Sequence, residues 1–442
     1  MKSKVGYALV LALIVGGSFG ASAQLADMQY FNRNDQNGRN LFETAKDDSV
    51  KYGGQKLRVG AGFMQAFQTL KNHNTATPNM VGGVDQNKPI KIEPGFGLAA
   101  ANMTFDAQLA DGVRLNLTLY LASRHHNDTW VKGGYIQMDK LPFLKGELFD
   151  NLMKYTTIKV GHMEVNYGDA HFRRNDNGNA ILNPFAENLI MDGFATEIAG
   201  EVNVHYNGLI GVLGLSNGLL KGDVIEKTNT KTGKTRSKKP SVYGKLGFDG
   251  YPVEGWRLRV TQSGYFNGGS TSNTLYSGDR GGSSYWGVLT SSTDLTANMA
   301  TGRYSPDFSY QVSSLMSNIF TKYRGLELFG TYEWAKGRPY TNDVAQVDKR
   351  TVHQIAGDLL YYFGEKENFY VGARYNRLSG ELAPTAMDAD ITRKAFAAGY
   401  FFTKNILLKA EYVKQTYDGF PANNIYNGAK FDGFVVEAVV GF

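Results

Sequence analysis

The chain has 442 residues and a formal net charge of +6, with 52 glycines, 26 tyrosines, 26 phenylalanines and no cysteine. The lack of cysteine excludes a disulfide-stapled scaffold, and the negative mean hydropathy of −0.33 argues against a helical membrane protein. This composition suits a large β structure, including a membrane barrel, in which half of each strand is polar.

The first 23 residues have the order of a secretory signal peptide. Lys2 and Lys4 precede an apolar run, and Ala21-Ser22-Ala23 supplies the small residues of a cleavage site after Ala23. A retained membrane anchor is the alternative, but the apolar run is short and interrupted by glycines. No later stretch reaches the roughly 20 apolar residues of a transmembrane helix. We therefore expect an exported protein.

Residues 24–56 are polar and lack a sustained period, so they are expected to form an N-terminal extension on the periplasmic side. They are too few for a globular plug domain. From Leu57 onward, apolar and polar residues alternate with period two, which predicts strands with one apolar face. Sixteen such strands are predicted, most of them near the roughly 9–11 residues that a tilted membrane strand requires. They are 57–67, 96–108, 113–124, 130–139, 155–165, 194–206, 208–216, 241–249, 256–266, 310–323, 325–336, 352–363, 368–378, 393–402, 406–417 and 431–442.

Strand 256–266 illustrates the pattern. Trp256, Leu258 and Val260 share one face, and Arg257 and Arg259 share the other. In this and other strands the apolar face begins or ends in an aromatic residue, as an interfacial girdle would. The alternation favours strands that present one face to lipid.

The connections alternate in length. Short turns such as 110–112, 207–208 and 364–367 lie between the long connectors 68–95, 166–193, 217–240, 267–309, 337–351, 379–392 and 418–430. Two connections break the rule: 125–129 is short and 140–154 is long. A soluble β-sandwich need not separate loop lengths in this way. The sequence therefore predicts an all-β fold, a transmembrane antiparallel β-barrel of about 16 strands over residues 57–442, with short periplasmic turns and long extracellular loops.

The last strand ends on Phe442. Phe434, Val436, Ala438 and Val440 share its face, and in a closed barrel this strand must pair with the first one. The ending resembles that of bacterial outer-membrane barrels, in which the outer-membrane assembly machinery reads a C-terminal aromatic residue. The resemblance implies that Phe442 is the assembly signal. The alternative is a buried edge strand that ends in phenylalanine.

The connector 166–193 reads NYGDAHFRRNDNGNAILNPFAENLIMDG. Its segments 168–178, 183–185 and 191–192 resemble the matching loop of porin-like outer-membrane proteins of Bacteroidota, which are similar to phosphate-selective porins. The resemblance implies a porin of the bacterial outer membrane for small hydrophilic or anionic solutes such as phosphate. It also implies a homotrimer, and a connector that folds into the lumen as a constriction loop.

Within this connector, Arg173 and Arg174 are the first candidates for pore-constriction and anion-binding residues, together with His171, Asp169 and Asp176. Guanidinium groups stay charged and match phosphate or carboxylate oxygens. The sequence leaves a second reading open, in which the arginines form ion pairs and fix the loop to the wall. Strand parity places further charges of both signs on the lumen wall, which predicts a transverse field. They are Arg114, Arg124, Lys159, Lys245, Arg257, Arg259, Arg374, Lys409, Glu197, Glu201, Glu327, Glu333, Asp358, Glu411 and Glu437.

Other function classes have less support. The basic connector 217–240 suits contact with lipopolysaccharide at the surface of the lipid bilayer, and no nucleic-acid partner is expected. The seven histidines lack ligand spacing, so no metal or cofactor is expected. No nucleophile motif groups Ser, His and acidic residues, so no enzyme is expected. The alternatives are a structural or adhesive surface barrel that uses 267–309 and, with less support, a barrel hydrolase.

Overall fold

The computed structural model describes residues 27–48, 50–121, 129–220, 224, 238–270, 272–277, 281–294, 298–341 and 347–442. The predicted signal peptide, Arg124 and most of the basic connector 217–240 lie outside these residues. No helix in the described part of the chain is long and apolar enough to cross a membrane.

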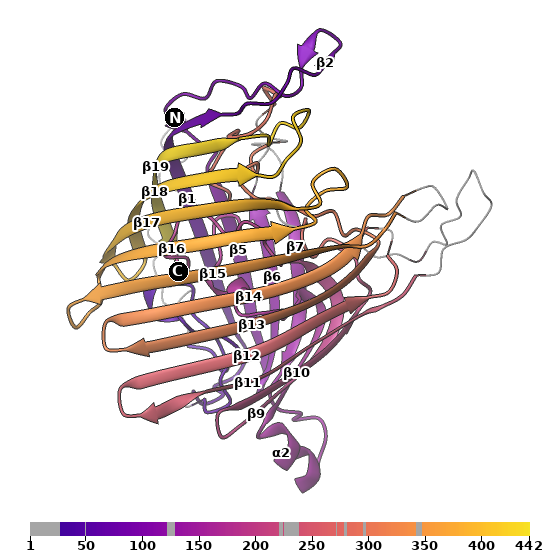
Figure 1. The fold of residues 1–442 in the computed structure, drawn as a ribbon. Coiled ribbons are helices and arrows are strands. Elements are labelled where there is room, and N and C mark those ends of the chain that lie inside the picture. The colour runs from indigo at the N-terminus through magenta and orange to yellow at the C-terminus, as the bar shows by residue number, and fades with distance from the viewer. Residues whose placement is uncertain are drawn as a thin grey trace, which may run out of the picture.

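Sixteen long antiparallel strands among the described residues form one closed sheet (Figure 1). Each long strand pairs with the next one along the chain, and β1 pairs with β19, so the sheet closes on itself. The predicted all-β barrel of sixteen strands is confirmed. The long strands are β1 (Lys56–His73), β5 (Ala100–Ala110), β6 (Val113–Leu121), β7 (Thr129–Met138), β8 (Thr156–Glu164), β9 (Thr196–Tyr206), β10 (Leu209–Ser216), β11 (Ser241–Val253), β12 (Trp256–Asn267), β13 (Gln311–Tyr323), β14 (Leu326–Arg338), β15 (Arg350–Phe363), β16 (Phe369–Gly380), β17 (Ala389–Thr403), β18 (Ile406–Asp418) and β19 (Lys430–Gly441).

The remaining elements are short. The first long connection carries β2 (Met80–Val81), β3 (Val84–Asp85) and β4 (Gly95–Phe96). The helices are η3 (Gln36–Gly38), α2 (Glu147–Met153) and η4 (Ala170–Arg173). None of them interrupts the ring of long strands.

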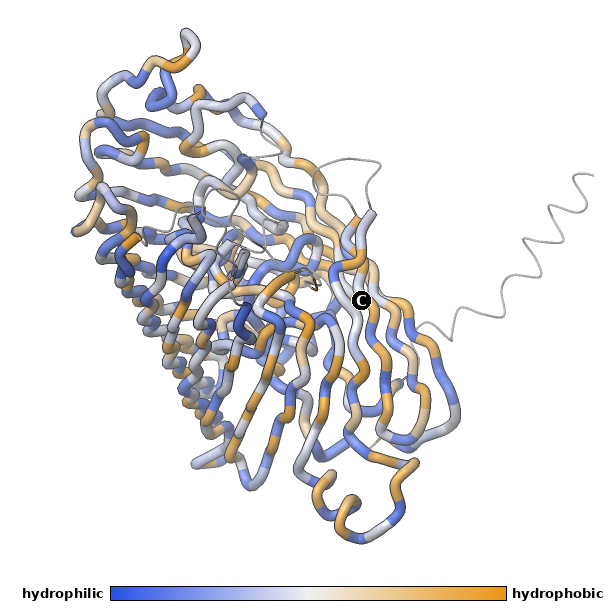
Figure 2. The backbone as a smooth tube through the Cα atoms, turned by 90° about the vertical axis from the view of Figure 1, so that its right-hand side faces the viewer, coloured by the Kyte–Doolittle hydropathy of each residue, from blue (hydrophilic) through white to orange (hydrophobic). Residues whose placement is uncertain are grey.

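The strands are apolar outside and polar inside. In β14, Leu326, Leu328 and Tyr332 are 48%, 39% and 46% exposed, whereas Glu327 and Glu333 are fully buried inside the barrel. Figure 2 shows the same alternation of hydrophobic and hydrophilic residues along many strands. Successive side chains of a strand point to opposite faces, so this pattern turns a continuous apolar belt outward.

Aromatic rings gather on the outer face near the short turns. The rings of Phe363 and Tyr361 lie 4.8 Å apart, those of Phe363 and Phe369 5.2 Å, and those of Tyr400 and Phe402 5.1 Å. All five side chains are exposed. Aromatic rows of this kind mark the edge of the apolar belt in membrane barrels.

The two ends of the barrel differ. At one end, called here the short-turn end, neighbouring strands join through tight turns such as Asn207-Gly208, where both residues have a positive φ, as a two-residue hairpin turn requires. The exception at this end is 139–155, which holds α2. The long connections leave from the opposite end, and the described residues of two of them, 165–195 and 268–310, fold back into the lumen.

The described N-terminal residues also lie inside the barrel. The sequence predicts a periplasmic extension over 24–56, but residues 29–48 and 50 form a collar that follows the inner wall at the short-turn end. The Asn34 side chain donates to the Ala61 carbonyl on β1 (3.4 Å). The Gln36 backbone then donates to Lys404 in the β17–β18 turn (2.8 Å).

The collar continues around the barrel. Arg39 pairs with Glu367 in the β15–β16 turn (3.2 Å). Lys46 donates to the Thr156 carbonyl on β8 (2.8 Å), and the Gln29 side chain donates to Asp111 after β5 (3.0 Å) and to the Val50 carbonyl (3.0 Å). The two ends of the collar therefore meet after one circuit. Its polar side chains have partners on the charged inner wall, which explains why this segment does not extend into solvent.

The last residue takes part in closing the barrel. The backbone N–H of Phe442 donates to the Ala61 carbonyl (3.0 Å), and that of Ala61 donates to the Phe442 carbonyl (3.1 Å). The Phe442 side chain is 39% exposed on the outer face. The strand that closes the barrel thus runs to the final residue.

We expect Phe442→Asp to abolish most of the folded barrel in outer-membrane fractions, because a carboxylate replaces the apolar end of the closing strand. The yield of the heat-modifiable form on gels measures this, with Phe442→Tyr as the control that keeps an aromatic ring. Normal yields from Phe442→Asp would show that Phe442 is not the assembly signal.

Candidate functional site

Residues 165–195, called here the lumen loop, cross the interior of the barrel. The Val165 N–H donates to the Ala195 carbonyl (3.0 Å) and closes the base of the loop. The Lys409 ammonium donates to three loop carbonyls, among them those of Asn183 (2.9 Å) and Phe185 (2.8 Å). An inward-facing lysine of the wall therefore holds the loop by its backbone.

Other wall side chains bind the lumen loop in the same way. Gln354 accepts from the Met191 N–H (2.9 Å) and donates to the Met191 carbonyl (2.7 Å). Arg374 pairs with Asp358 (2.7 Å) and donates to the Glu187 carbonyl (2.8 Å). These polar groups satisfy a loop backbone that would otherwise be buried without partners.

Four charges meet where the collar, the lumen loop and the wall come together. Asp169 of the loop accepts from Lys245 on β11 (2.8 Å) and from Arg259 on β12 (2.8 and 2.9 Å). Glu43 of the collar pairs with the same two cations (2.9 and 2.8 Å). All four side chains are at most 1% exposed. Burial opposes ionisation of Asp169, but the charges and hydrogen bonds of Lys245 and Arg259 outweigh it and lower the Asp169 pKa.

Arg173 links the same three parts of the molecule. It donates to Glu327 on β14 (2.7 Å) and to the Asn40 side chain of the collar, and its guanidinium lies 4.9 Å from the Phe329 ring. Its side chain is 4% exposed. This geometry matches the second reading of the sequence, in which the arginine fixes the loop to the wall; its role in anion binding stays a prediction.

Arg174 makes its main ion pair within the lumen loop. It donates to both carboxylate oxygens of Asp192 (2.6–3.2 Å) and stacks 3.8 Å from the Phe194 ring. Unlike Arg173, it lines the central cavity described below.

The second loop, 268–310, packs over the lumen loop from the long-loop end. Ser283 donates to Glu187 (2.6 Å), and Tyr285 donates to Glu411 on β18. The Trp286 N–H donates to Gln68 on β1 (2.8 Å). The two loops thus contact each other and the inner wall, and together they occupy much of the lumen.

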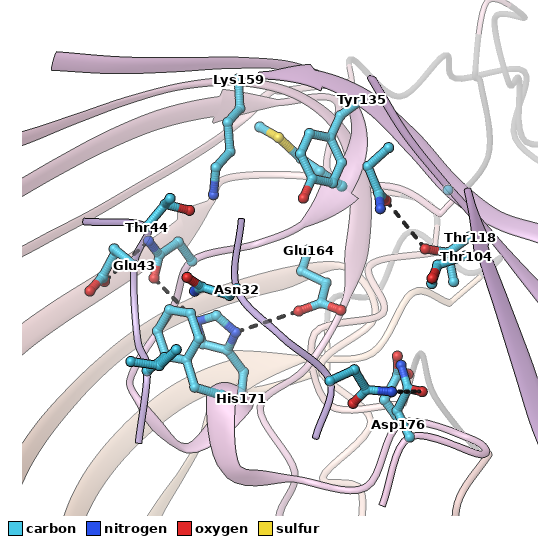
Figure 3. A pocket seen from close by; sticks show the side chains of 18 of the residues that line it. Asn32, Glu43, Thr44, Thr104, Thr118, Tyr135, Lys159, Glu164, His171 and Asp176 are labelled. Atoms are coloured by element: carbon cyan, nitrogen blue, oxygen red, sulfur yellow. Dashed lines mark hydrogen bonds and ion pairs between the residues drawn. The ribbon is translucent and has the colours of Figure 1, made fainter. Parts of the chain in front are cut away.

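A central cavity of about 310 Å³ remains in the lumen. Strands β5–β9 form one wall, and the collar and the first half of the lumen loop form the other (Figure 3). Lys159 and Tyr135 project from the strands towards His171 and Glu43 on the opposite side. This cavity is the candidate functional site because charged side chains of both signs line it.

Lys132 is a cation at one end of the cavity. The β6–β7 pairing shifts register between Thr118 and Leu119, which leaves Lys132 opposite no residue, as in a β-bulge. The bulge turns Lys132 inward, where it pairs with Glu164 (2.6 Å) and with Asp176 of the lumen loop. Asp176 also accepts from the Tyr120 hydroxyl.

His171 lies beside Glu164, with Nδ1 3.7 Å from a carboxylate oxygen and Nε2 3.1 Å from the Asn166 side-chain oxygen. Its ring lies 3.8 Å from the ring of Phe172. Burial lowers the pKa of the His171 imidazole, which favours its neutral form.

Lys159 is less tightly held. Its ammonium lies 3.7 Å from Glu201, and its side chain is 19% exposed. In contrast, Arg114 is buried against Asp106 and also donates to Gln137 (3.0 Å). Lys159 is therefore the wall cation that a solute in the cavity reaches most easily.

The predicted site residues lie in different parts of the interior. Arg174, His171, Asp176, Arg114, Lys159 and Glu201 line the cavity. Lys245, Arg259, Arg374, Lys409, Glu327 and Glu333 face inward but are enclosed by the loops, as are Asp169, Asp358, Glu411 and Glu437, while Glu197 binds Ser216 and Tyr265 (2.7 Å). Arg257 is partly exposed near the short-turn end and pairs with Asp249 (2.6 Å).

Several charged cavity residues were not predicted, among them Lys132, Glu164 and Glu43. Because of the bulge, the alternation of β7 does not indicate that Lys132 points inward. Glu164 is the last residue of β8, where apolar and polar residues alternate only weakly. Glu43 belongs to a segment without any period, so sequence spacing carries no signal for it. No group of three or more His, Cys, Asp or Glu that could hold a metal ion occurs among the described residues.

No protein-family profile and no curated protein sequence matches the chain. Among solved structures, an anion-selective porin from Comamonas acidovorans is 9% identical, with a TM-score of 0.48, over 88% of this chain and 100% of the porin. The outer membrane channel DcaP of Acinetobacter baumannii is 12% identical, and Salmonella typhi OmpF in complex with daunomycin is 11% identical; each match has a TM-score of 0.48 and covers 89% of this chain and 99% of the other. At TM-scores below 0.5, these likenesses carry no argument about function.

Proposed function

We propose that this chain is a porin of the bacterial outer membrane, through which small hydrophilic solutes diffuse passively. The observation that carries the proposal is the closed barrel with an apolar, aromatic-edged outer face and a charged cavity inside. Such an outer face is stable against lipid and costly in water. The expected partners are therefore the lipid bilayer and lipopolysaccharide, after delivery by the outer-membrane assembly machinery.

The solute path runs along β5–β9. A second cavity of about 180 Å³ shares Phe31, Asn32, Arg33 and Thr44 with the central one. A third, of about 640 Å³ at the short-turn end, shares Tyr30 with the second. The three cavities form a series from the middle of the barrel to its short-turn end, and the collar lines all of them.

The charges along the central cavity support weak ion selectivity. Five basic residues line it, Arg33, Arg114, Lys132, Lys159 and Arg174, and five acidic ones, Glu43, Asp106, Glu164, Asp176 and Glu201. The resemblance of the lumen loop to phosphate-selective porins favours anions, whereas the equal numbers of basic and acidic side chains favour neither sign of ion. Both signs on opposing walls create a transverse field that orients polar solutes.

We expect Lys159→Ser to shift the ratio of anion to cation permeability about fivefold towards cations, because a unit charge roughly 8 Å away in water attracts an anion and repels a cation by about 0.5 kcal/mol each. The reversal potential in a KCl gradient measures this shift. Arg173→Ser is the matched variant. It should lower thermal stability with little effect on ion preference, because Glu327 then loses its ion-pair partner.

The opposite pair of results would contradict the roles assigned here to Lys159 and Arg173. A large change in reversal potential with Arg173→Ser, and none with Lys159→Ser, would place the constriction at the arginine pair of the lumen loop. It would also favour the anion preference that the resemblance implies.

A barrel with a structural or adhesive surface role is the second candidate, because two loops and the collar occupy much of the lumen. Single-channel current in a planar bilayer separates the two. A porin conducts steadily, whereas a surface barrel should be nearly closed. A homotrimer is part of the porin proposal, and its mass in mild detergent tests that part separately.

A further inference from the structure

The long connection at the short-turn end borders the channel proposed above with only one of its faces. Residues 139–155, called here the foot, begin with a turn in which the Leu144 N–H donates to the Leu141 carbonyl (2.9 Å). Gly146, with a φ of +139°, then redirects the chain into α2. In Figure 1 the foot projects beyond the end of the barrel.

The foot has two unlike faces. Lys140, Lys145, Asp150 and Lys154 line the third cavity, between the foot and the barrel turns. On α2, Leu148 and Leu152 are 77% and 54% exposed; they are four residues apart and so share one face of the helix. Phe143, in the preceding turn, is 64% exposed. None of these three apolar residues lines the cavity.

The foot is continuous with the aromatic edge of the outer belt. Its last residue, Tyr155, accepts at its carbonyl a hydrogen bond from the His205 N–H (2.8 Å). The Tyr155 ring lies 5.1 Å from that of Tyr206, and both side chains are exposed on the outer face. The neighbouring Leu209 is 59% exposed. The exposed apolar side chains of the foot thus begin where the belt ends.

We propose that the foot lies in the head-group region of the bilayer on the short-turn side, with Phe143, Leu148 and Leu152 among the upper parts of the lipid chains. This inference rests on the proposed membrane location of the barrel. A seven-residue helix is unstable alone in water, and partial insertion at an interface supplies the contact that it lacks. Three side chains are too few for a specific protein interface, which buries about 1,200 Å² or more.

Because the chain has no cysteine, single-cysteine variants carry one spin label each. Leu148→Cys is labelled with a nitroxide in liposomes of phosphatidylethanolamine and phosphatidylglycerol. Its accessibility to dissolved oxygen is compared with its accessibility to a water-soluble nickel chelate. Asp150→Cys, on the cavity side of the same helix, is the matched control. Leu213→Cys, whose native leucine is 65% exposed on the outer face of β10, reports whether the barrel is in the bilayer.

The label at position 148 should be several-fold more accessible to oxygen than to the nickel chelate, and the label at 150 should show the reverse. If position 213 reports lipid but 148 reports water, the foot is not a lipid contact, and the porin proposal stands. Shielding of position 148 from both reagents would mean that a second copy or another protein covers it. If the label at position 213 itself reports water, the proposed membrane location of the barrel is wrong, and so is the proposed lipid contact of the foot.

Discussion

A variant that lacks residues 27–46 should conduct several-fold more current per channel than the intact protein in a planar bilayer. The collar supplies Phe31, Phe42 and Thr44 to the walls of the central cavity, so its removal widens the path. Loss of Glu43 also leaves Lys245 and Arg259 with Asp169 as their shared carboxylate, which should move ion preference towards anions.

A variant in which 27–46 is replaced by a glycine-serine segment of equal length controls for chain length and for the distance from the predicted signal peptide. It should also conduct more than the intact protein, because it lacks the side chains that bind the inner wall. Unchanged conductance in a heat-modifiable, folded form of both variants would show that the collar does not limit the channel.

The Asp169→Asn variant should lose thermal stability to a degree unusual for a single substitution. Removing one partner of a buried ion pair costs about 3–5 kcal/mol, because the remaining charge is buried without compensation. Here two cations, Lys245 and Arg259, depend on Asp169 and Glu43. The temperature at which the folded band disappears on gels measures the effect.

Asp390→Asn is the control for this variant. Asp390 pairs with Arg377 (2.9 Å), but both side chains are partly exposed, at 30% and 50%, so its loss should cost no more than about 1 kcal/mol. If Asp169→Asn and Asp390→Asn unfold at the same temperature, the buried cluster does not stabilise the interior of the barrel.

The strands could be predicted because lipid and lumen impose opposite demands on alternate residues. Leu326 and Leu328 must face outward and Glu327 inward, and that period survives in the sequence whatever the loops do. Strand ends were less predictable. β1 continues to His73 and β15 begins at Arg350, beyond the predicted ends, because these strands extend past the apolar belt, where period two no longer carries information.

The interior could not be predicted to the same extent. Parity indicates that Lys409 and Arg374 point inward, but it cannot indicate that a loop will lie against them. The partners of the collar were even less predictable, because Asn40 donates to Glu327, which lies 287 positions away along the chain. Contacts at that separation depend on the closed barrel and leave no local pattern in the sequence.

The circuit of the collar has a consequence for the order in which the molecule forms. Its binding surface is assembled from β1, β8, β12, β14 and the β15–β16 and β17–β18 turns, so that surface is complete only when all of these strands are in place. We therefore expect this N-terminal segment to be among the last parts of the molecule to reach its final position. On this expectation a newly closed barrel has a wider lumen than the finished one, until its N-terminal segment lies against the inner wall at the short-turn end.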